Sequence, residues 1–303
     1  MAGLPGVSVV IPTYNRADVL GEAIDSAFAQ DVPGLEVVVV DDGSTDDTPR
    51  LLDERRGRHG PALTVVRQAN AGESAARNEG IRRARNGLVA LLDSDNRWRP
   101  GKLAKQLALH AADPSLEFSF TGYATFGSGC RDVVLHGWDP DATTALEELL
   151  VGCCINTSTV VATKRLLADV GLFDTSLECC QDHDLWLRVA ARGHRIGYVP
   201  EVLLDYRVHA EGTSSNQALV AESSERVITR LFSNGELPER VQAEQRSHLA
   251  RWQLNSAVRY LEARDGRSAR RAIYRALRTR PSAFRPGWLR LFAGSVASSR
   301  RAE

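Results

Sequence analysis

The sequence is poor in the residues that build disulfide frameworks and zinc sites. Among its 303 residues there are five cysteines, Cys130 and the adjacent pairs Cys153-Cys154 and Cys179-Cys180. This odd number, without any Cys-x-x-Cys spacing, favours neither a disulfide framework nor a zinc site. We therefore expect small, buried, reduced thiols.

Long hydrophobic runs and targeting signals are also missing. No apolar run approaches the ~18 residues of a membrane-spanning helix, and the first residues lack the basic and then apolar pattern of a signal peptide. We expect a cytoplasmic protein. Its 38 basic and 38 acidic residues cancel, which argues against a nucleic-acid partner.

Lysine is scarce, and the positive charge is unevenly distributed. There are only three lysines in the chain, whereas residues 264–303 hold eleven arginines against Asp265 and Glu303. The same segment carries four apolar residues: Trp288, Leu289, Leu291 and Phe292. Such a segment suits peripheral contact with an anionic membrane surface. The alternative is that arginine is simply the default cation of this chain.

The first hundred residues alternate between short apolar runs and amphipathic stretches. Four runs are rich in β-branched residues or leucine and have almost no polar alternation: 7–11, 35–40, 63–66 and 88–92. Strands buried on both faces have this pattern. Helical patterns lie between them, at 19–28, from about 44–46 onward, and at about 72–85. The alternation predicts an α/β fold with right-handed crossovers and a parallel sheet.

The pattern changes twice further along the chain. From about residue 115 it is mixed, with strand-like pieces at 116–120, 157–162, 195–199 and 202–206 and a helix near 182–191. From about residue 214 it is helical and charged, with breaks near 235–238, 266 and 280–281. We predict one domain over residues 1–213 and a helical C-terminal extension over 214–303.

Polar clusters follow three of the predicted strands, at 13–15, 41–44 and 93–95. Ligands of such sheets bind beyond the carboxyl ends of the strands. Asp93 and Asp95 stand two residues apart, so both can serve one Mg²⁺ or Mn²⁺, which leaves its other positions to phosphate oxygens and water. Taken alone, such a pair is usually a solvated turn. The pair Asp41-Asp42 is placed to accept hydrogen bonds from a base or ribose, and a plain helix-capping turn explains it poorly.

Four motifs occur in a fixed order: VSVVIPTYNR at 7–16, VDDGSTD at 40–46, NAG at 70–72 with ARN at 76–78, and DSD at 93–95. Together they resemble family 2 glycosyltransferases of the GT-A fold, over roughly residues 7–210. The resemblance implies a Rossmann-like, mostly parallel sheet flanked by helices. It also implies a donor half at about 1–112 and an acceptor half at about 113–213, and it does not include the last third of the chain.

The resemblance implies a donor nucleotide site. Pro12, Tyr14 and Asp42 would line the nucleobase pocket, with Tyr14 stacking on the base and Asp42 accepting a hydrogen bond from it. The alternative for Tyr14 is an ordinary loop aromatic. Arg77 would lie near the diphosphate, its alternative being a solvated helix charge. The metal-side residues come from the DSD motif: Asp93 would face the ribose or the metal, and Asp95 would ligate Mn²⁺ or Mg²⁺ directly.

A second group of motifs resembles the acceptor side of the family. GLFD at 171–174 precedes QDHDLWLR at 181–188, where the family has a Glu-Asp pair whose aspartate is the catalytic base. Here the aspartate is Asp182, and Gln181 stands where the family has glutamate. The replacement leaves the base in place but affects the contact that residue 181 would make with the acceptor. Asp182 could instead serve only as a helix cap, a role that the helix dipole favours. His183 and Asp184 are alternative candidates for the base.

The segment YRVH at 206–209, with Ser214 and Ser215, resembles the loop that closes over the donor diphosphate. His209 is a candidate for an additional metal or phosphate contact; its alternative is polar surface.

The implied reaction is transfer of a sugar from a nucleotide-diphosphate donor to an acceptor hydroxyl. One metal and one base, without a carboxylate nucleophile, suit a single displacement with inversion at the anomeric carbon. The acceptor would be a glycan, a lipid-linked glycan or a small molecule, in polysaccharide or glycolipid synthesis.

Three other functions compete with this one. A non-catalytic nucleotide-sugar-binding scaffold is suggested only by Gln181. A phosphatase would need a carboxylate nucleophile after the first strand, and that strand ends in Pro12-Thr13-Tyr14-Asn15. A nucleotidyltransferase would favour a basic glycine-rich loop there, and only Arg16 is available.

Overall fold

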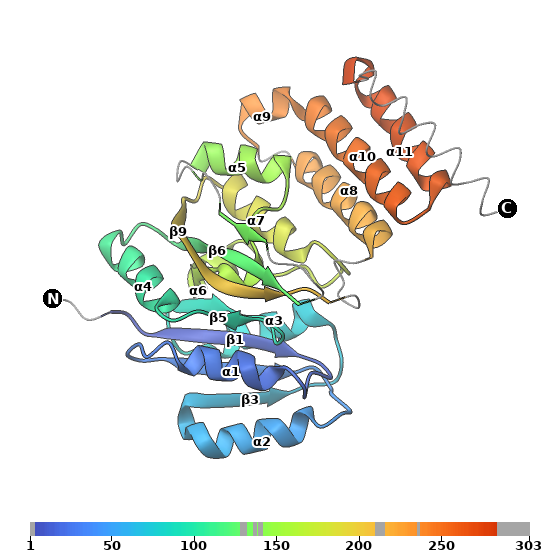
Figure 1. Ribbon diagram of the computed structural model, residues 1–303. Helices are drawn as coiled ribbons and strands as arrows, with labels where there is room; N and C mark the ends of the chain where they lie inside the picture. The colour runs from blue at the N-terminus through green and yellow to red at the C-terminus, as the bar shows by residue number, and fades with distance from the viewer. Residues whose placement is uncertain are drawn as a thin grey trace. The chain divides into compact units, whose positions relative to one another are not determined.

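The computed structural model describes residues 4–127, 132–135, 138, 142–209, 216–234 and 237–283 (Figure 1). The chain divides into two compact units. The first comprises residues 1–146, 153–175 and 193–209, and the second comprises 147–152, 176–192 and 210–303. The predicted domain boundary at residue 213 stays a prediction. Several residues singled out above lie outside the described ranges: Cys130, Ser214, Ser215, Trp288, Leu289, Leu291 and Phe292.

A mixed sheet forms the centre of the first unit, and its described strands follow the order β3-β2-β1-β4-β8-β6-β9-β5, with β7 paired to β6. Their bounds are β1 Val7–Thr13, β2 Glu36–Asp41, β3 Leu63–Arg67, β4 Leu88–Leu91, β5 Arg97–Trp98, β6 Phe118–Phe126, β7 Val133–Val134, β8 Val161–Thr163 and β9 Ile196–Arg207. Strands β3, β2, β1 and β4 run parallel, as do β6 and β9. Antiparallel pairs attach β8, β7 and β5.

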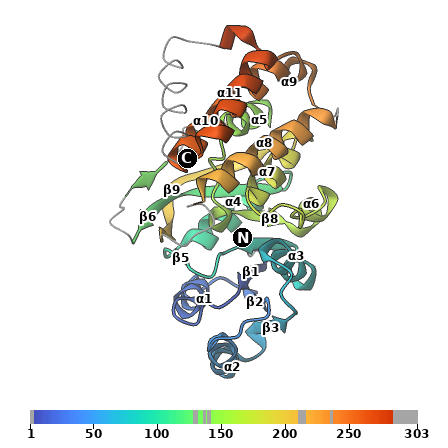
Figure 2. The ribbon, with the colours of Figure 1, turned by 90° about the vertical axis from the view of Figure 1, so that its right-hand side faces the viewer.

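Helices cover both faces of the parallel part of the sheet. The helices of the first unit are α1 Leu20–Phe28, α2 Thr48–His59, α3 Glu73–Arg83, α4 Lys102–Ala112 and α6 Lys164–Asp169. Helix α5, Ala142–Val151, belongs to the first unit up to residue 146 and to the second from residue 147. Figure 2 shows α1 and α3 on opposite sides of β1. The reason lies in the alternation of side chains along a strand: Val37 and Val39 belong to the core with α1, whereas Val38 and Val40 pack with Ala76 of α3.

The close approach of α3 to the sheet depends on a glycine. A Cβ atom on Gly80 would lie 2.4 Å from Cγ1 of Val10, so only glycine lets the helix pack at this distance. The four predicted apolar runs coincide with β1 to β4, and β1, β2 and β4 are buried along their whole length. The predicted α/β fold class is confirmed: helices flank a mixed sheet, and a helical region follows it in the chain.

The structure differs from the sequence-based elements in several places, and helices α4, α5 and α6 lie where no helix was predicted. The two strand-like pieces at 195–199 and 202–206 form the single strand β9, because it pairs with β6 across an irregular register between Thr121 and Tyr123. The piece predicted at 157–162 begins with a 3₁₀ turn, Thr157–Thr159, before β8. Helix α2 begins at Thr48 rather than at 44–46, because residues 44–46 form a turn around the side chain of Asn15.

The second unit is helical. It contains α7 Gln181–Ala191, α8 Gln217–Ser233, α9 Glu239–Ala243, α10 Gln245–Glu262 and α11 Gly266–Thr279. Small side chains form the contact between α10 and α11, where Ala257 packs with Ala272 and Ile273. Asp265 caps α11 by accepting a hydrogen bond from the backbone N–H of Ser268 at 2.9 Å. Among the described residues, no helix is both long and apolar enough to cross a membrane.

Candidate active site

The carboxyl ends of β1, β2 and β4 meet at one edge of the sheet, here called the donor edge: residues 12–16, 41–46 and 93–96. Thr13 pairs with Asp41 in the parallel register of β1 and β2. Leu92, directly after β4, donates its N–H to the carbonyl oxygen of Val10 at 3.0 Å. The three predicted polar clusters therefore lie side by side in the first unit.

The loop after β1 presents the predicted base-binding residues. Pro12 is buried inside β1 opposite Val40, whereas Tyr14 is 47% exposed. Asn15 takes up the left-handed backbone conformation, with φ 51°, and its N–H donates to Oγ of Ser44 at 2.9 Å. Its side-chain oxygen accepts from the N–H of Thr45 at 2.8 Å. Asn15 thus joins the two loops and leaves the ring of Tyr14 at the surface; it was not among the predicted site residues.

Asp42 is buried, and its carboxylate organises the loop between β3 and α3. Oδ1 accepts from the side-chain amide of Gln68 at 2.7 Å and from the N–H of Ala71 at 2.9 Å, and Oδ2 accepts from the N–H of Gly72 at 2.8 Å. Gly43, with φ 83°, makes this approach feasible, because a Cβ there would lie 2.9 Å from the backbone nitrogen of Asn70. Three of the roughly four acceptor positions of a carboxylate are thereby used.

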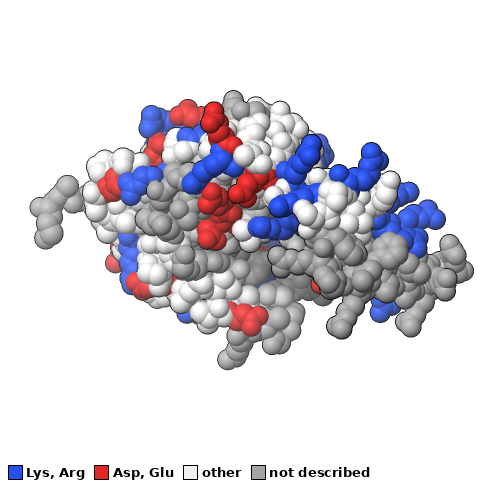
Figure 3. All heavy atoms as spheres, turned by 90° about the horizontal axis from the view of Figure 1, so that it is seen from above, with Lys and Arg blue, Asp and Glu red and all other residues white. Residues whose placement is uncertain are grey.

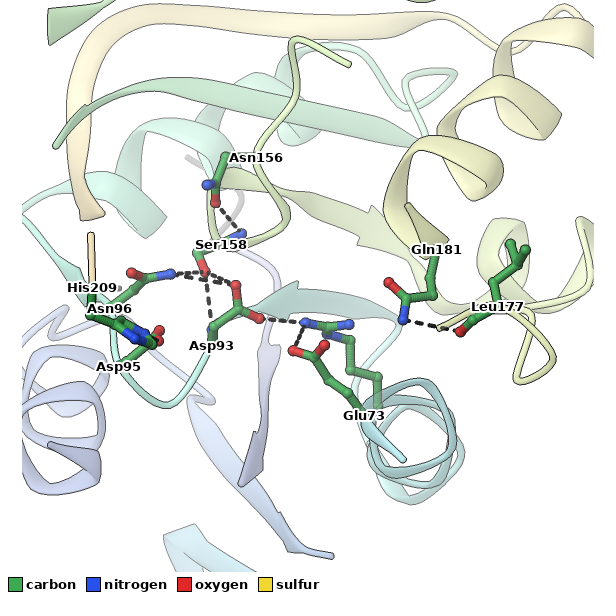
Figure 4. A network of polar contacts seen from close by, with 10 residues as sticks. Glu73, Asp93, Asp95, Asn96, Asn156, Ser158, Leu177, Gln181 and His209 are labelled. Carbon is green, nitrogen blue, oxygen red and sulfur yellow. Dashed lines mark hydrogen bonds and ion pairs between the residues drawn. The ribbon is translucent and has the colours of Figure 1, made fainter. Parts of the chain in front are cut away.

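Asp93 is held on both carboxylate oxygens (Figure 4). Oδ1 accepts from the guanidinium of Arg77 at 2.7 Å. Oδ2 accepts from Oγ of Ser158 at 2.9 Å and from the amide of Asn96 at 3.4 Å. Arg77 also forms an ion pair with Glu73. The structure therefore places Arg77, predicted near the diphosphate, against Asp93, where it positions that carboxylate.

Two of these partners were not anticipated from the sequence. Asn96 directly follows the DSD motif, so its place in the sequence could have indicated that it belongs to the site. Ser158 comes from the turn before β8 and is fixed there because its N–H donates to Oδ1 of Asn156 at 2.9 Å (Figure 4). It lies 65 residues from Asp93 in the chain, and no local pattern announces that contact.

Asp95 is held differently. Its backbone carbonyl accepts from Nε of Arg207 at 2.9 Å, and Oδ2 lies 3.0 Å from Nε2 of His209. Among the described residues, no hydrogen bond reaches Oδ1. Arg207 also donates its backbone N–H to the amide oxygen of Asn96 at 2.9 Å. The end of β9 therefore holds the DSD loop without using Oδ1 of Asp95.

Asp95 and His209 form the only pair of predicted ligands that the described structure brings together. Within the described residues no group of three or more His, Cys, Asp or Glu side chains could hold a metal ion. Two ligands are nevertheless enough for Mg²⁺ or Mn²⁺, because these ions keep most of their positions for water and for phosphate oxygens of a substrate. One carboxylate and one imidazole therefore fit a donor-dependent metal site.

Asp182 belongs to the second unit, in the first turn of α7. Its Oδ1 accepts from the N–H of His183 at 2.7 Å. The other two candidates for the base are committed elsewhere. The ring of His183 is buried and Nε2 lies 2.8 Å from the carbonyl oxygen of Leu149, and burial lowers its pKa. Asp184 is 4% exposed and is paired with Arg188 and Arg230 at 2.7 and 2.6 Å.

Known proteins resemble this chain in sequence and in fold. The model of the family described as Glycosyl transferase family 2 matches residues 8–129. A Bacillus subtilis protein named "Putative teichuronic acid biosynthesis glycosyltransferase TuaG" is 31% identical over 225 residues, which cover 73% of this chain and 86% of that protein.

Two solved structures share the fold. S. aureus TarS 1-349 in complex with UDP-GlcNAc has a TM-score of 0.67 and 19% identity, covering 97% of this chain and 89% of that chain. The mannosyltransferase PcManGT from Pyrobaculum calidifontis, in complex with GDP-Man and Mn²⁺, has a TM-score of 0.65 and 21% identity, covering 99% and 87%. The sequence match to the family model and to a relative of nearly full length, on this fold, shows that the chain belongs to glycosyltransferase family 2.

Proposed function

We propose that this glycosyltransferase moves a sugar from a nucleoside-diphosphate sugar to an acceptor hydroxyl, with inversion at the anomeric carbon. The observation that carries the proposal is the contrast within the DSD motif. Both oxygens of Asp93 accept hydrogen bonds from protein groups, whereas Asp95 shares one oxygen with His209 and has no described donor on the other. A carboxylate left available at the carboxyl edge of a parallel sheet is suited to a metal-bound diphosphate.

The donor class follows from the donor edge and from the fold relatives. The exposed ring of Tyr14 offers a stacking surface for a base, and Asp42 keeps about one acceptor position beyond its loop contacts. The two solved structures that share the fold are complexes with UDP-GlcNAc and with GDP-Man. We infer a nucleoside diphosphate sugar for this chain as well. The base and the sugar depend on the shape of the pocket rather than on these motifs.

Asp95 and His209 are the residues that would hold Mn²⁺ or Mg²⁺. When bound, such an ion neutralises charge on the departing diphosphate as a Lewis acid. Asp93 would lie beside it as a fixed negative charge, held by Arg77, and we place it toward the ribose. Arg77 itself serves the diphosphate indirectly, through Asp93, because its side chain is 6% exposed and its guanidinium is already paired with that carboxylate.

Asp182 is the proposed general base, which takes the proton of the acceptor hydroxyl. His183 and Asp184 are less suited, since the first is a buried ring bonded to Leu149 and the second is paired with two arginines. With one base and no second carboxylate acting as nucleophile, the attacking hydroxyl displaces the diphosphate in a single step, so the configuration inverts. A product of retained configuration, read by NMR, would refute this assignment.

The acceptor is proposed to be a hydroxyl of a growing or lipid-linked glycan at the cytoplasmic face of a membrane. The relative named for teichuronic acid biosynthesis supports a polysaccharide product. Three arginines of the basic segment are exposed on α11, namely Arg267, Arg271 and Arg275, and basic side chains gather over the C-terminal helices (Figure 3). Binding to anionic vesicles tests a role for residues 284–303. If a variant lacking these residues binds the vesicles as tightly as the full chain does, they have no such role.

The decisive experiment is calorimetric titration with UDP, GDP, dTDP and CDP, each with and without Mn²⁺, followed by turnover of Asp182→Asn. We expect one diphosphate to bind in a metal-dependent way. Asp182→Asn should keep that affinity while its turnover falls by roughly 10²–10⁴-fold. If no nucleotide binds under either condition, the proposed donor site is wrong, and if Asp182→Asn turns over normally, the base lies elsewhere.

A further inference from the structure

The second unit brings two thiols together directly before the proposed base. The sulfurs of Cys179 and Cys180 lie 3.7 Å apart, which is contact distance. Both are free thiols; Cys179 is buried and Cys180 is partly exposed. The proposed reaction makes no use of either, and they are followed at once by Gln181 and Asp182 at the start of α7.

The backbone of Cys180 determines how α7 begins. Cys180 has φ 61° and ψ 25°, the left-handed region that non-glycine residues seldom occupy. Its carbonyl oxygen accepts the first hydrogen bond of the helix, from the N–H of Asp184 at 3.0 Å. The preceding loop is closed by the amide of Gln181, which donates to the carbonyl oxygen of Leu177 at 3.1 Å (Figure 4).

Contacts with α8 hold this conformation in place. The sulfur of Cys180 lies 3.4 Å from Oγ of Ser224 and 3.9 Å from the carbonyl oxygen of Val220. A non-glycine residue in this region is strained and keeps this conformation only where its surroundings hold it. The thiol of Cys180 is therefore one of the groups that fix the first turn of α7, which carries Asp182.

We propose that Cys179 and Cys180 are a modification site that a hydroperoxide converts to a vicinal disulfide, and that this disulfide stops transfer by displacing Asp182. The second half of the proposal rests on the assignment of Asp182 as the general base; the first half does not.

The chemistry balances with hydrogen peroxide as oxidant. The sulfur of Cys180 attacks one peroxide oxygen, the O–O bond breaks, and the other oxygen leaves as water, so Cys180 becomes a sulfenic acid. The sulfur of Cys179 then attacks that of Cys180, the S–S bond forms and a second water leaves. Two electrons pass from the two sulfurs to the peroxide. The thiol of Cys179 and the hydroxyl of Ser224 lower the pKa of Cys180, which suits it to the first attack.

Forming the bond must alter the turn. The sulfurs have to close from 3.7 Å to about 2 Å, and neighbouring Cα atoms are about 3.8 Å apart, less than the separation that most disulfides adopt. The ring is therefore strained and easily reduced. Its closure draws the sulfur of Cys180 away from Ser224 and Val220 and turns the peptide whose carbonyl starts α7.

The modification itself is tested without reference to activity. A Cys130→Ser/Cys153→Ser/Cys154→Ser variant keeps only this pair, and both cysteines fall on one tryptic peptide, residues 166–188. After hydrogen peroxide, alkylation and digestion, we expect that peptide to be unalkylated and lighter by two hydrogen atoms. Dithiothreitol should reverse the change. Two alkylated thiols, or irreversible oxidation of Cys180 alone, would overturn the proposal.

The coupling to Asp182 is tested on the same protein with donor and acceptor. A displacement of about 1 Å at a reacting group can cost roughly 10²-fold, so we expect oxidation to lower kcat by that order while the Kd of the nucleotide stays unchanged. Cys180→Ser, which lacks the thiol that attacks the peroxide, should show no further loss of kcat after the same treatment. If the disulfide forms and kcat does not change, the coupling is wrong. If Asp182→Asn turns over normally, the base assignment fails while the peptide result stands.

Discussion

The donor edge of the first unit and the outer helices α8 and α11 of the second unit differ in how their charged side chains are held. At the donor edge of the first unit, Asp42 and Asp93 are at least partly buried, and each accepts at least three hydrogen bonds from protein groups. On the outer helices of the second unit the arginine of the ion pair is exposed: Arg275, which pairs with Glu225, is 44% exposed, whereas Arg77, which pairs with Asp93, is 6% exposed.

This difference separates two kinds of charge. A buried carboxylate with fixed donors is held in one place, because losing any donor leaves an uncompensated charge away from water. A surface pair is screened by solvent and contributes little. We therefore expect substitutions at the donor edge to have large and specific effects, and those on the outer faces of α8 and α11 to have small ones.

The largest effect is expected for Arg77→Met. This change removes the guanidinium that pairs with Asp93 at 2.7 Å, where Arg77 is 6% exposed. Breaking a buried ion pair on one side costs roughly 3–5 kcal/mol of unfolding free energy. Urea unfolding measures it. Arg82→Met is the matched control, since Arg82 is on the same helix and its side chain is 59% exposed. Equal losses in the two variants would break the comparison.

Asp95→Asn should act on binding rather than on stability. The substitution keeps the shape of the side chain but removes the charge that would hold the metal. Because loss of groups that merely support a metal ligand already costs 10–100-fold in metal affinity, we expect a loss of at least about 10²-fold in Mn²⁺-dependent nucleotide affinity. Tm should stay near the wild-type value. Asp93→Asn gives the contrast, with a lowered Tm. Unchanged Mn²⁺ dependence in Asp95→Asn would contradict the metal assignment.

Lys102 is a buried ionisable group whose amine has no hydrogen-bonding partner among the described residues. It is fully buried at the start of α4. The amine lies 4.1 Å from the ring centroid of Trp98, a contact that favours the charged form. Burial outweighs it, because an ammonium loses its hydration and gains no anionic partner, so the pKa of Lys102 is well below 10.5.

From this pKa the sign of a pH effect follows. Between the folded and unfolded pKa values the unfolded chain binds more protons, so the stability of the wild type rises with pH in that window. Lys102→Met lacks this dependence. We expect it to be more stable by roughly 1–2 kcal/mol near pH 7, with an advantage that shrinks toward pH 10. Chemical unfolding at the two pH values checks this, and a gain that grows with pH would show that Lys102 is charged in the fold.

Local sequence patterns predicted the donor edge but not how it is held. Buried runs followed by Asp41-Asp42 and by Asp93 place carboxylates at a common edge, because parallel strands end on the same side. The partners are a different matter. Ser158 reaches Asp93 across 65 residues, and Arg207 reaches Asp95 across 112. Such contacts depend on how β8 and β9 join the sheet, and strand pairing over such distances leaves no periodic signal.

The resemblance supplied a role for Arg77 but not its partner. A positive residue in the third motif suggested direct contact with phosphate, whereas the side chain is enclosed by Asp93, Glu73 and the ring of Phe173. The choice among Asp182, His183 and Asp184 was likewise open, because all three share the first turn of a helix. The partners Leu149, Arg188 and Arg230 make His183 and Asp184 less suited to the role, and Asp182 as the base stays a prediction.

The smallest effect is expected for Arg275→Gln on α11. Arg275 contacts both carboxylate oxygens of Glu225 on α8, at 2.9 and 2.6 Å, so a pair of this geometry could hold the two helices together. The side chain of Arg275 is 44% exposed, however. We therefore expect Arg275→Gln to lower the unfolding free energy in urea by only about 0.2–1 kcal/mol, and by less at high salt. Arg271→Gln, on the same helix and also exposed, should lie at the low end. A loss approaching that of Arg77→Met would mean that Arg275 is structural, and the case for an anionic surface as the partner of Arg275 would weaken with it.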